Sequence, residues 1–222
     1  MKRLTKATLR TALNLFFFTV IGTTILAYTF NLTHEQIAQS EDAAKLKLIN
    51  QVAPGSQYDN DLLKDNITLA ASAQLGTEQD TLAYRGRLQG QPSIIVLEAI
   101  APDGYSGKIG MIVAIGYDGT ISGVRVVTHK ETPGLGDYID IAKNQWISLF
   151  SGASHTRYQE GDWKVKKDGG QIDYMAGATI TPRAVAKAVH NALHYFEENR
   201  AMLFAENASV TKGASKQEAG TK

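Results

Sequence analysis

One short segment combines a hydroxyl side chain with a glycine-containing turn, directly before a long run with helical apolar spacing. It reads Asp173-Tyr174-Met175-Ala176-Gly177-Ala178-Thr179, and Ile180-Thr181-Pro182-Arg183 follows. The spacing predicts Thr181 as a helix N-cap and Pro182 as the first helical residue, which places Thr179 just outside the helix. Free N–H groups and the macrodipole at a helix N-terminus favour a phosphate there. An ordinary capped helix start is the alternative that spacing alone leaves open.

A second segment with chemical potential ends a predicted strand and continues into a glycine-rich loop. It reads His129-Lys130-Glu131-Thr132-Pro133-Gly134-Leu135-Gly136. Loops held by a rigid sheet often carry ligand contacts, and glycines let the backbone approach a flat ring closely. The same pattern also fits a strand that ends in an ordinary turn, so both interpretations stay open.

Other reactive arrangements are weakly supported. His190 and His194 are four residues apart and could reach one metal ion, but the sequence indicates no third ligand, so we expect no metal site. The chain has no cysteine, which excludes thiolate-bound iron-sulfur clusters and leaves an organic cofactor as the carrier if the protein handles electrons. Its formal net charge is only +1, and four basic residues in the first ten positions more than account for this excess, so a nucleic-acid partner is not expected.

The N-terminal part contains a predicted transmembrane helix. No residue from Thr11 to Phe30 is charged, and about twenty residues at roughly 1.5 Å each cross the hydrocarbon core of a bilayer. Lys2, Arg3, Lys6 and Arg10 precede the span, so the positive-inside rule keeps the N-terminus cytoplasmic and places the rest of the chain in the periplasm of a Gram-negative cell. The stretch is longer than the apolar region of a signal peptide.

The region after the span alternates between helical and strand-like patterns. A helix is predicted from His34 to about Val52, followed by a polar connector. Four segments separated by turn sequences predict an antiparallel meander: residues 83–88, 93–100, 108–117 and 121–127. A helix over residues 137–150 and a hairpin over 163–172 should follow, and the last helix should bury Val185, Val189, Ala192 or Leu193, and Phe196. This order predicts an α+β fold.

Together the two segments resemble the FMN-binding domain of the G subunit of the Rnf (Rsx) ion-translocating electron transport complex. The likeness rests on Asp173-x-x-Ala176-Gly177-Ala178-Thr179, the run through Ile180-Thr181-Pro182-Arg183, and the His129 to Gly136 loop. It covers the chain except the tail. One position is looser than the family pattern, because Ala176 stands where Ser or Thr is frequent.

The resemblance implies a covalent flavin. In that family the final Thr of the motif carries FMN through a phosphoester bond installed by a flavin transferase, and here that residue is Thr179. Weaker assignments to the cofactor site are Gly177, Ala178, Thr181, Arg183, Thr132, Gly134 and Leu135. The implied partners are the other subunits of an Rnf-type complex in the bacterial inner membrane. That complex couples electron transfer between NADH and ferredoxin to ion movement, and this component is not expected to catalyse a reaction alone.

The expected organisation follows from the patterns and the resemblance together. It comprises a basic N-terminus (1–10), a transmembrane helix (11–30), a juxtamembrane helix and connector (31–80), the FMN-binding domain (81–205) and a disordered tail (206–222). Two alternatives remain at this point. One is the related C subunit of the Na⁺-translocating NADH:quinone oxidoreductase, and the other is a membrane-anchored periplasmic scaffold without redox activity.

Overall fold

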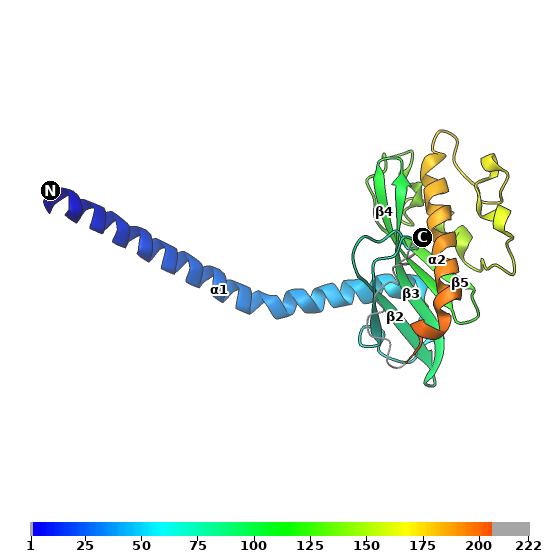
Figure 1. Cartoon of the computed structure of the whole chain (residues 1–222), viewed down its shortest axis with the longest axis horizontal. Helices are drawn as coiled ribbons and strands as arrows, with labels where there is room; N and C mark the ends of the chain where they lie inside the picture. The colour runs from blue at the N-terminus through cyan, green and yellow to red at the C-terminus, as the bar shows by residue number, and fades with distance from the viewer. Residues whose placement is uncertain (1, 206–222) are drawn as a thin grey trace, which may run out of the picture. The chain divides into compact units, whose positions relative to one another are not determined.

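The computed structural model describes residues 2–205, so the predicted disordered tail lies outside the described residues. The chain divides into two compact units, Met1–Lys45 and Leu46–Lys222. The first belongs to a long helix, α1 (Lys2–Val52), whose last residues are part of the second unit (Figure 1). The helix is continuous, so the predicted transmembrane and juxtamembrane helices are one element that ends just before Pro54-Gly55, as expected.

The segment Leu9–Phe30 of α1 is long and apolar enough to cross a membrane. Its large side chains are exposed, and those of Phe16, Phe17 and Phe18 are each more than half exposed. The threonines within it donate hydrogen bonds to carbonyl groups four residues earlier, as Thr23 Oγ1 does to Thr19 O at 2.8 Å. These bonds satisfy hydroxyl groups that would find no water partner in lipid. The segment therefore has the properties of a single membrane anchor.

The second unit is built on one antiparallel sheet whose strands follow sequence order. They are β1 (Asn66–Leu69), β2 (Thr81–Leu88), β3 (Gln91–Gly104), β4 (Gly107–Gly116) and β5 (Ile121–Thr128). The four predicted strands are confirmed as a meander. Strand β1 was missed because its four residues, Asn-Ile-Thr-Leu, are too few for the alternation of apolar side chains to stand out from a polar connector.

The sheet has a hydrophobic core on each face because its central strands alternate between two sets of apolar side chains. On β3, Ile95 and Leu97 join the larger core, whereas Ile94 and Val96 join the smaller one. Helix α2 (Ile180–Leu203) packs against β3 and β4 in the larger core (Figure 1). The predicted face of this helix is confirmed, with Val185, Val189, Ala192, Leu193 and Phe196 fully buried. On the opposite face the sheet is covered by Ile49, Val52 and Ala53.

Two predictions for the segment between β5 and α2 were wrong. The expected helix over 137–150 is two 3₁₀ helices, η2 (Asp137–Ile139) and η3 (Gln145–Phe150), because Asn144 adopts an extended backbone and caps the second one through its side chain. The expected hairpin over 163–172 is instead η4 (Glu160–Trp163) and η5 (Lys166–Asp168), with a single parallel bridge between Val165 and Ile172. In this segment Trp146, Phe150 and Trp163 bury large rings in the core, and tertiary packing overrides local periodicity.

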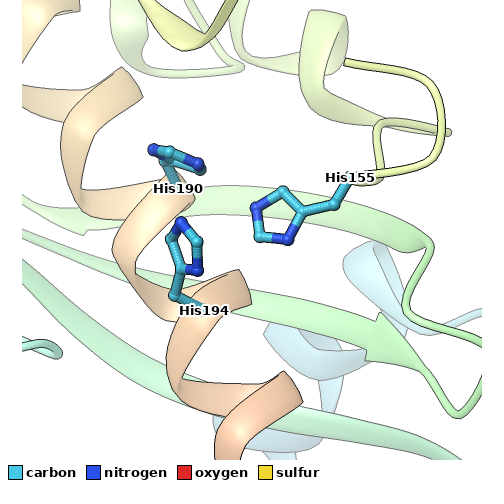
Figure 2. A group of neighbouring side chains, drawn as sticks. All are labelled: His155, His190 and His194. Carbon is cyan, nitrogen blue, oxygen red and sulfur yellow. The ribbon is translucent and has the colours of Figure 1, made fainter. Parts of the chain in front are cut away.

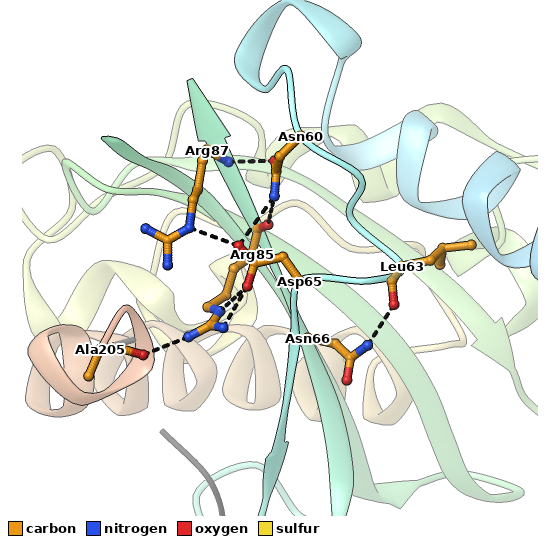
Figure 3. A network of polar contacts seen from close by, with 7 residues as sticks. All are labelled: Asn60, Leu63, Asp65, Asn66, Arg85, Arg87 and Ala205. Carbon is orange, nitrogen blue, oxygen red and sulfur yellow. Dashed lines mark hydrogen bonds and ion pairs between the residues drawn. The ribbon is translucent and has the colours of Figure 1, made fainter. Parts of the chain in front are cut away.

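A polar network ties the edge of the sheet to the end of α2 (Figure 3). The carboxylate of Asp65 accepts from Arg85 Nε at 2.6 Å and from Arg87 Nε at 2.8 Å. Arg85 is buried, and its Nη1 donates to the carbonyl of Ala205 at 2.7 Å. Asn60 bridges the same strand by donating to Arg85 O and accepting from Arg87 N. The buried guanidinium is therefore compensated on both sides.

Candidate cofactor site

The motif segment forms a tight turn that leads directly into α2. Ala178 N donates to Met175 O at 3.1 Å, and Gly177 occupies the third position of the turn with φ of +88°. A type II turn requires a positive φ at that position, which glycine adopts without steric cost. Thr179 follows at once as the residue before the first helical residue, and its hydroxyl makes no cap hydrogen bond. The Thr179 hydroxyl, which the sequence predicts as the attachment point of the flavin phosphate, is therefore not engaged in capping the helix.

The prediction that Thr181 caps the helix was wrong. Helix α2 begins two residues earlier than predicted, at Ile180 instead of Pro182, because Thr179 already has a right-handed helical backbone, and the first i→i−4 bond runs from Arg183 N to Thr179 O. Thr181 is buried inside the first turn, where its hydroxyl donates to Glu131 Oε2 at 2.5 Å. Its oxygen is committed to an acid from the second segment rather than to the helix end.

Glu131 organises this end of the domain, although sequence reasoning did not assign it a role at the site. Its second carboxylate oxygen accepts from Ser106 N, in the β3–β4 hairpin, at 3.0 Å. The loop carrying Glu131 comes close as well, because a Cβ added to Gly136 would lie 2.7 Å from Glu131 Oε2 and 3.0 Å from Thr181 Oγ1. Gly136 thus permits a contact that any larger residue would block. One buried carboxylate fixes the hairpin, the glycine-rich loop and the helix start together.

The turn Met175–Ala178, here called the acceptor turn because it precedes Thr179, is also held by Tyr138. Its hydroxyl donates to Ala178 O and accepts from Met175 N, both at 3.3 Å, so the same oxygen contacts both ends of the turn. Burial raises the pKa of Tyr138, which keeps the phenol protonated and able to donate. Trp146 adds a further bond from its indole nitrogen to Asp173 O at 2.6 Å. The backbone around Thr179 is therefore held in place before any ligand binds.

These segments enclose a pocket of about 340 Å³, a volume within the range of small-molecule sites. Its lining residues come from the hairpin, the glycine-rich loop, the acceptor turn and the first turn of α2: Tyr105, Glu131, Thr132, Leu135, Gly136, Gly177, Ala178, Thr179, Ile180 and Thr181. The apolar side chains at its mouth are unusually exposed, at 67% for Tyr105, 51% for Leu135 and 46% for Ile180. Such surface is suited to a flat aromatic ring.

The residues present fit FMN in two respects. The hydroxyl of Thr179 and the backbone N–H groups of Ile180 and Thr181, the first two residues of α2, belong to residues that line the same pocket, as a phosphate requires. The exposed apolar side chains supply a second, water-excluding part for a ring system.

Comparison with known proteins agrees with this arrangement. A family model for the FMN-binding domain matches residues 104–194, and one for the RnfG N-terminal region matches residues 1–52. The G subunit of the ion-translocating oxidoreductase complex of Vibrio atlanticus is 48% identical over 189 residues, which cover 85% of this chain and 90% of that protein. The corresponding protein of Pseudomonas aeruginosa (strain UCBPP-PA14) is 44% identical over 200 residues, covering 90% of this chain and 94% of the relative.

The chain belongs to the G-subunit family of ion-translocating oxidoreductase complexes.

In this member of the family, the structure gathers most of the residues that the sequence assigned to the site. Gly177, Ala178, Thr179, Thr181, Thr132 and Leu135 all line the pocket. Gly134 does not line it but shapes the loop, with φ of +76° and its N–H donating to Asp137 Oδ1 at 2.7 Å.

Arg183 lies elsewhere. Its guanidinium makes two bonds with the carboxylate of Asp168, at 2.6 and 2.9 Å, and lines a separate hollow. This pairing lowers the pKa of Asp168 and raises that of Arg183. The arginine therefore already has an anionic partner in the protein.

Tyr105 and Ile180 are lining residues that sequence reasoning missed. The signal for Tyr105 was its place between Gly104 and Gly107, at the tip of a hairpin, where a large exposed aromatic ring has no structural task. Nothing in the linear sequence indicated that this tip lies beside the acceptor turn.

Proposed function

We propose that this chain is the flavin-carrying subunit of a membrane-bound complex that couples electron transfer between NADH and ferredoxin to ion translocation. In this proposal FMN is attached through its phosphate to Thr179 Oγ1. The observation that carries the assignment is the different state of the two neighbouring hydroxyls. Thr179 lies in the pocket with no cap hydrogen bond, whereas Thr181 is buried and donates to Glu131.

The attachment requires an activated flavin and an outside catalyst. A free phosphate monoester offers no good leaving group, so the donor must be a flavin nucleotide in which the FMN phosphate is part of an anhydride, as in FAD. The Thr179 oxygen then forms the new P–O bond, the anhydride P–O bond breaks, and AMP leaves. The carboxylate that shares the pocket, Glu131, already accepts from Ser106 N and Thr181 Oγ1. We therefore assign removal of the Thr179 proton to a flavin transferase.

When bound, FMN would supply reversible one- and two-electron chemistry, and the protein would supply position and electrostatics. The turn held by Tyr138 would fix the phosphate end, and the N–H groups of Ile180 and Thr181 would be available to donate to the phosphate. Tyr105, Leu135 and Ile180 would contact the ring and exclude water from part of it. These three side chains are each at least 46% exposed, so a ring bound against them would stay accessible to partner subunits.

The anchor and the charge distribution support the proposed location. Four basic residues precede the uncharged part of the Leu9–Phe30 segment, and by the positive-inside rule they favour a cytoplasmic N-terminus and a periplasmic pocket-bearing unit. A non-covalent flavin would be lost from that compartment by diffusion. A covalent phosphoester therefore fits a carrier domain on the outer side of a bacterial inner membrane.

The test is flavin retention after denaturation. The full chain, co-expressed with a flavin transferase, should give a fluorescent band on a denaturing gel and an FMN adduct on the peptide containing Thr179. Thr179→Ala should lose both signals, and Thr179→Ser should keep them because a hydroxyl remains. Thr128→Ala, which changes an exposed threonine that does not line the pocket, is the matched control and should stay fluorescent. A fluorescent band from Thr179→Ala would refute the assignment.

A further inference from the structure

Three histidines meet on the α2 side of the molecule. His190 and His194 lie on successive turns of the helix, and His155 reaches toward them from the loop that follows η3 (Figure 2). One ring nitrogen from each lies within 4.8 Å of the others. The third histidine that the sequence did not indicate is thus supplied by a segment 35 positions earlier than His190. Imidazole groups that converge in this way are ligands for transition-metal ions.

Hydrogen bonding within residues 2–205 leaves the Nε2 atoms of His155 and His190 available. His155 Nδ1 lies 2.7 Å from Glu197 Oε2, and because an ionised carboxylate only accepts, the proton is on Nδ1. In the neutral ring, the opposite nitrogen, Nε2, then carries a free lone pair. The Nε2 atoms of His155 and His190 are both buried and have no hydrogen-bond partner within residues 2–205. The His190 side chain is nine-tenths buried, so bulk water does not satisfy it.

A fourth ligand is close by. Glu160 Oε2 lies 3.5 Å from His190 Nε2 and 3.5 Å from His194 Nε2. Ligand atoms around a tetrahedral zinc ion, at bond lengths of about 2.0 to 2.1 Å, are separated by about 3.3 Å. The carboxylate is therefore nearly at ligand spacing from both rings. Its side chain is 80% exposed and free to adjust.

The surroundings hold the rings in place. Trp163 stacks on His190 with centroids 4.8 Å apart and planes 12° from parallel, and it contacts His155 edge-on. The Glu197–His155 bond is the carboxylate–histidine arrangement that orients metal ligands in known sites.

We propose that His155, His190 and His194 bind one divalent transition-metal ion, with Zn²⁺ as the best fit, that Glu160 is the fourth ligand, and that Glu197 orients His155. Four protein ligands leave no open coordination position, which is typical of a structural site. The ion would join the loop and 3₁₀ segment over residues 153–163 to α2. That segment continues through Val165 and Ile172 into the acceptor turn, so the site would stabilise the support of Thr179.

Zinc binding can be measured on the full chain in detergent, purified with an affinity tag that lacks histidine. The protein is stripped with a chelator, equilibrated with ZnCl₂ and dialysed, and bound zinc is counted by elemental analysis. We expect one Zn²⁺ per chain. An excess of Mg²⁺ or Ca²⁺ should not displace it, because these ions prefer oxygen ligands. Co²⁺ in its place should show the intense visible absorption of tetrahedral coordination.

Variants identify the ligands. His155→Gln and His194→Gln should each lower zinc affinity by at least about 100-fold, and Glu197→Gln should lower it by about 10- to 100-fold, since it acts only through His155. His194 is part-exposed, so its replacement should leave the fold intact even if His155→Gln does not fold. His129→Gln is the matched control and should bind as the native chain does. Thr179→Ala should also keep its zinc, which separates this site from the flavin proposal.

Less than one zinc per chain at saturating ZnCl₂, or equal affinity in the native chain and in folded His194→Gln, would overturn the proposal. A tetrahedral Co²⁺ spectrum that survives in both histidine variants would do the same, because the ion would then be bound elsewhere.

Discussion

Glu131 is one buried carboxylate that connects several segments around the pocket. Both of its oxygens are occupied, one by the backbone of the β3–β4 hairpin and one by the hydroxyl of Thr181. The glycine at position 136 lets the loop close over it. Because both oxygens are used in this way, the role of Glu131 is to position the segments that line the pocket.

Replacing Glu131 with Ala should therefore destabilise the protein and loosen the pocket. The change leaves Thr181 Oγ1 and Ser106 N without their acceptor, and unsatisfied buried groups cost about 1 to 3 kcal/mol each. The thermal midpoint of the full chain in detergent should fall by roughly 5 °C or more. Glu78→Ala is the control, because this exposed acid pairs with the exposed Lys108 and its loss should leave the midpoint unchanged. An equal midpoint for both variants would contradict the positioning role.

At the scale of elements, the sheet edge depends on the Asp65 network. Strand β1 is only four residues long and pairs with β2 alone, so few ladder hydrogen bonds hold it. Asp65, directly before β1, adds charged hydrogen bonds to Arg85 and Arg87 on β2 (Figure 3). The same Arg85 reaches the end of α2 at Ala205. One acid therefore links the first strand to the last helix.

Asp65→Ala should be strongly destabilising. It leaves the buried guanidinium of Arg85 without its carboxylate, and breaking a buried pair from one side costs about 3 to 5 kcal/mol. The matched control is Asp61→Ala in the same loop, whose partner Lys64 is almost fully exposed, and its effect should be far smaller. Chemical denaturation followed by tryptophan fluorescence measures both. A loss in Asp65→Ala no larger than in Asp61→Ala would show that the network is dispensable.

At the scale of the whole molecule, the boundary of the folded unit does not coincide with the end of the membrane span. The compact unit begins at Leu46, inside α1, because Ile49, Val52 and Ala53 are each at most 1% exposed and form part of the smaller core. They cover Ile94, Val96 and their neighbours on the sheet face opposite α2. The end of the anchor helix is thus a structural component of the pocket-bearing unit.

Truncation tests this boundary. A chain that starts at Leu46 should be soluble without detergent and keep native circular dichroism, because it retains the smaller core. A chain that starts at Pro54 lacks Ile49 and Val52, whose burial contributes about 3 to 6 kcal/mol together, and it should unfold or aggregate. Gel filtration without detergent separates the two outcomes. If both chains were equally soluble and folded, the helix end would not belong to the core.

The sequence determined the features that depend on local patterns. An uncharged run of about twenty residues defines a span, alternating Val, Ile and Leu between turn sequences define the meander of β2 to β5, and helical spacing defines the buried face of α2. Several residues of the pocket could also be found from the sequence, because Thr179 and the Thr132 to Gly136 loop stand in recognisable motifs. These signals are carried by neighbours in the chain, so a linear reading suffices.

The tertiary structure decided what depends on residues that are distant in the chain. The helix start moved to Ile180 because Glu131, fifty positions earlier, takes the Thr181 hydroxyl that spacing had assigned to the cap. The segment over 137–172 became short 3₁₀ turns because its aromatic rings pack into a core built by other elements. Similarly, His190 and His194 acquired a third histidine only when the loop bearing His155 folded against α2. Side chains compete for partners across the whole molecule, and that competition leaves no trace in local spacing.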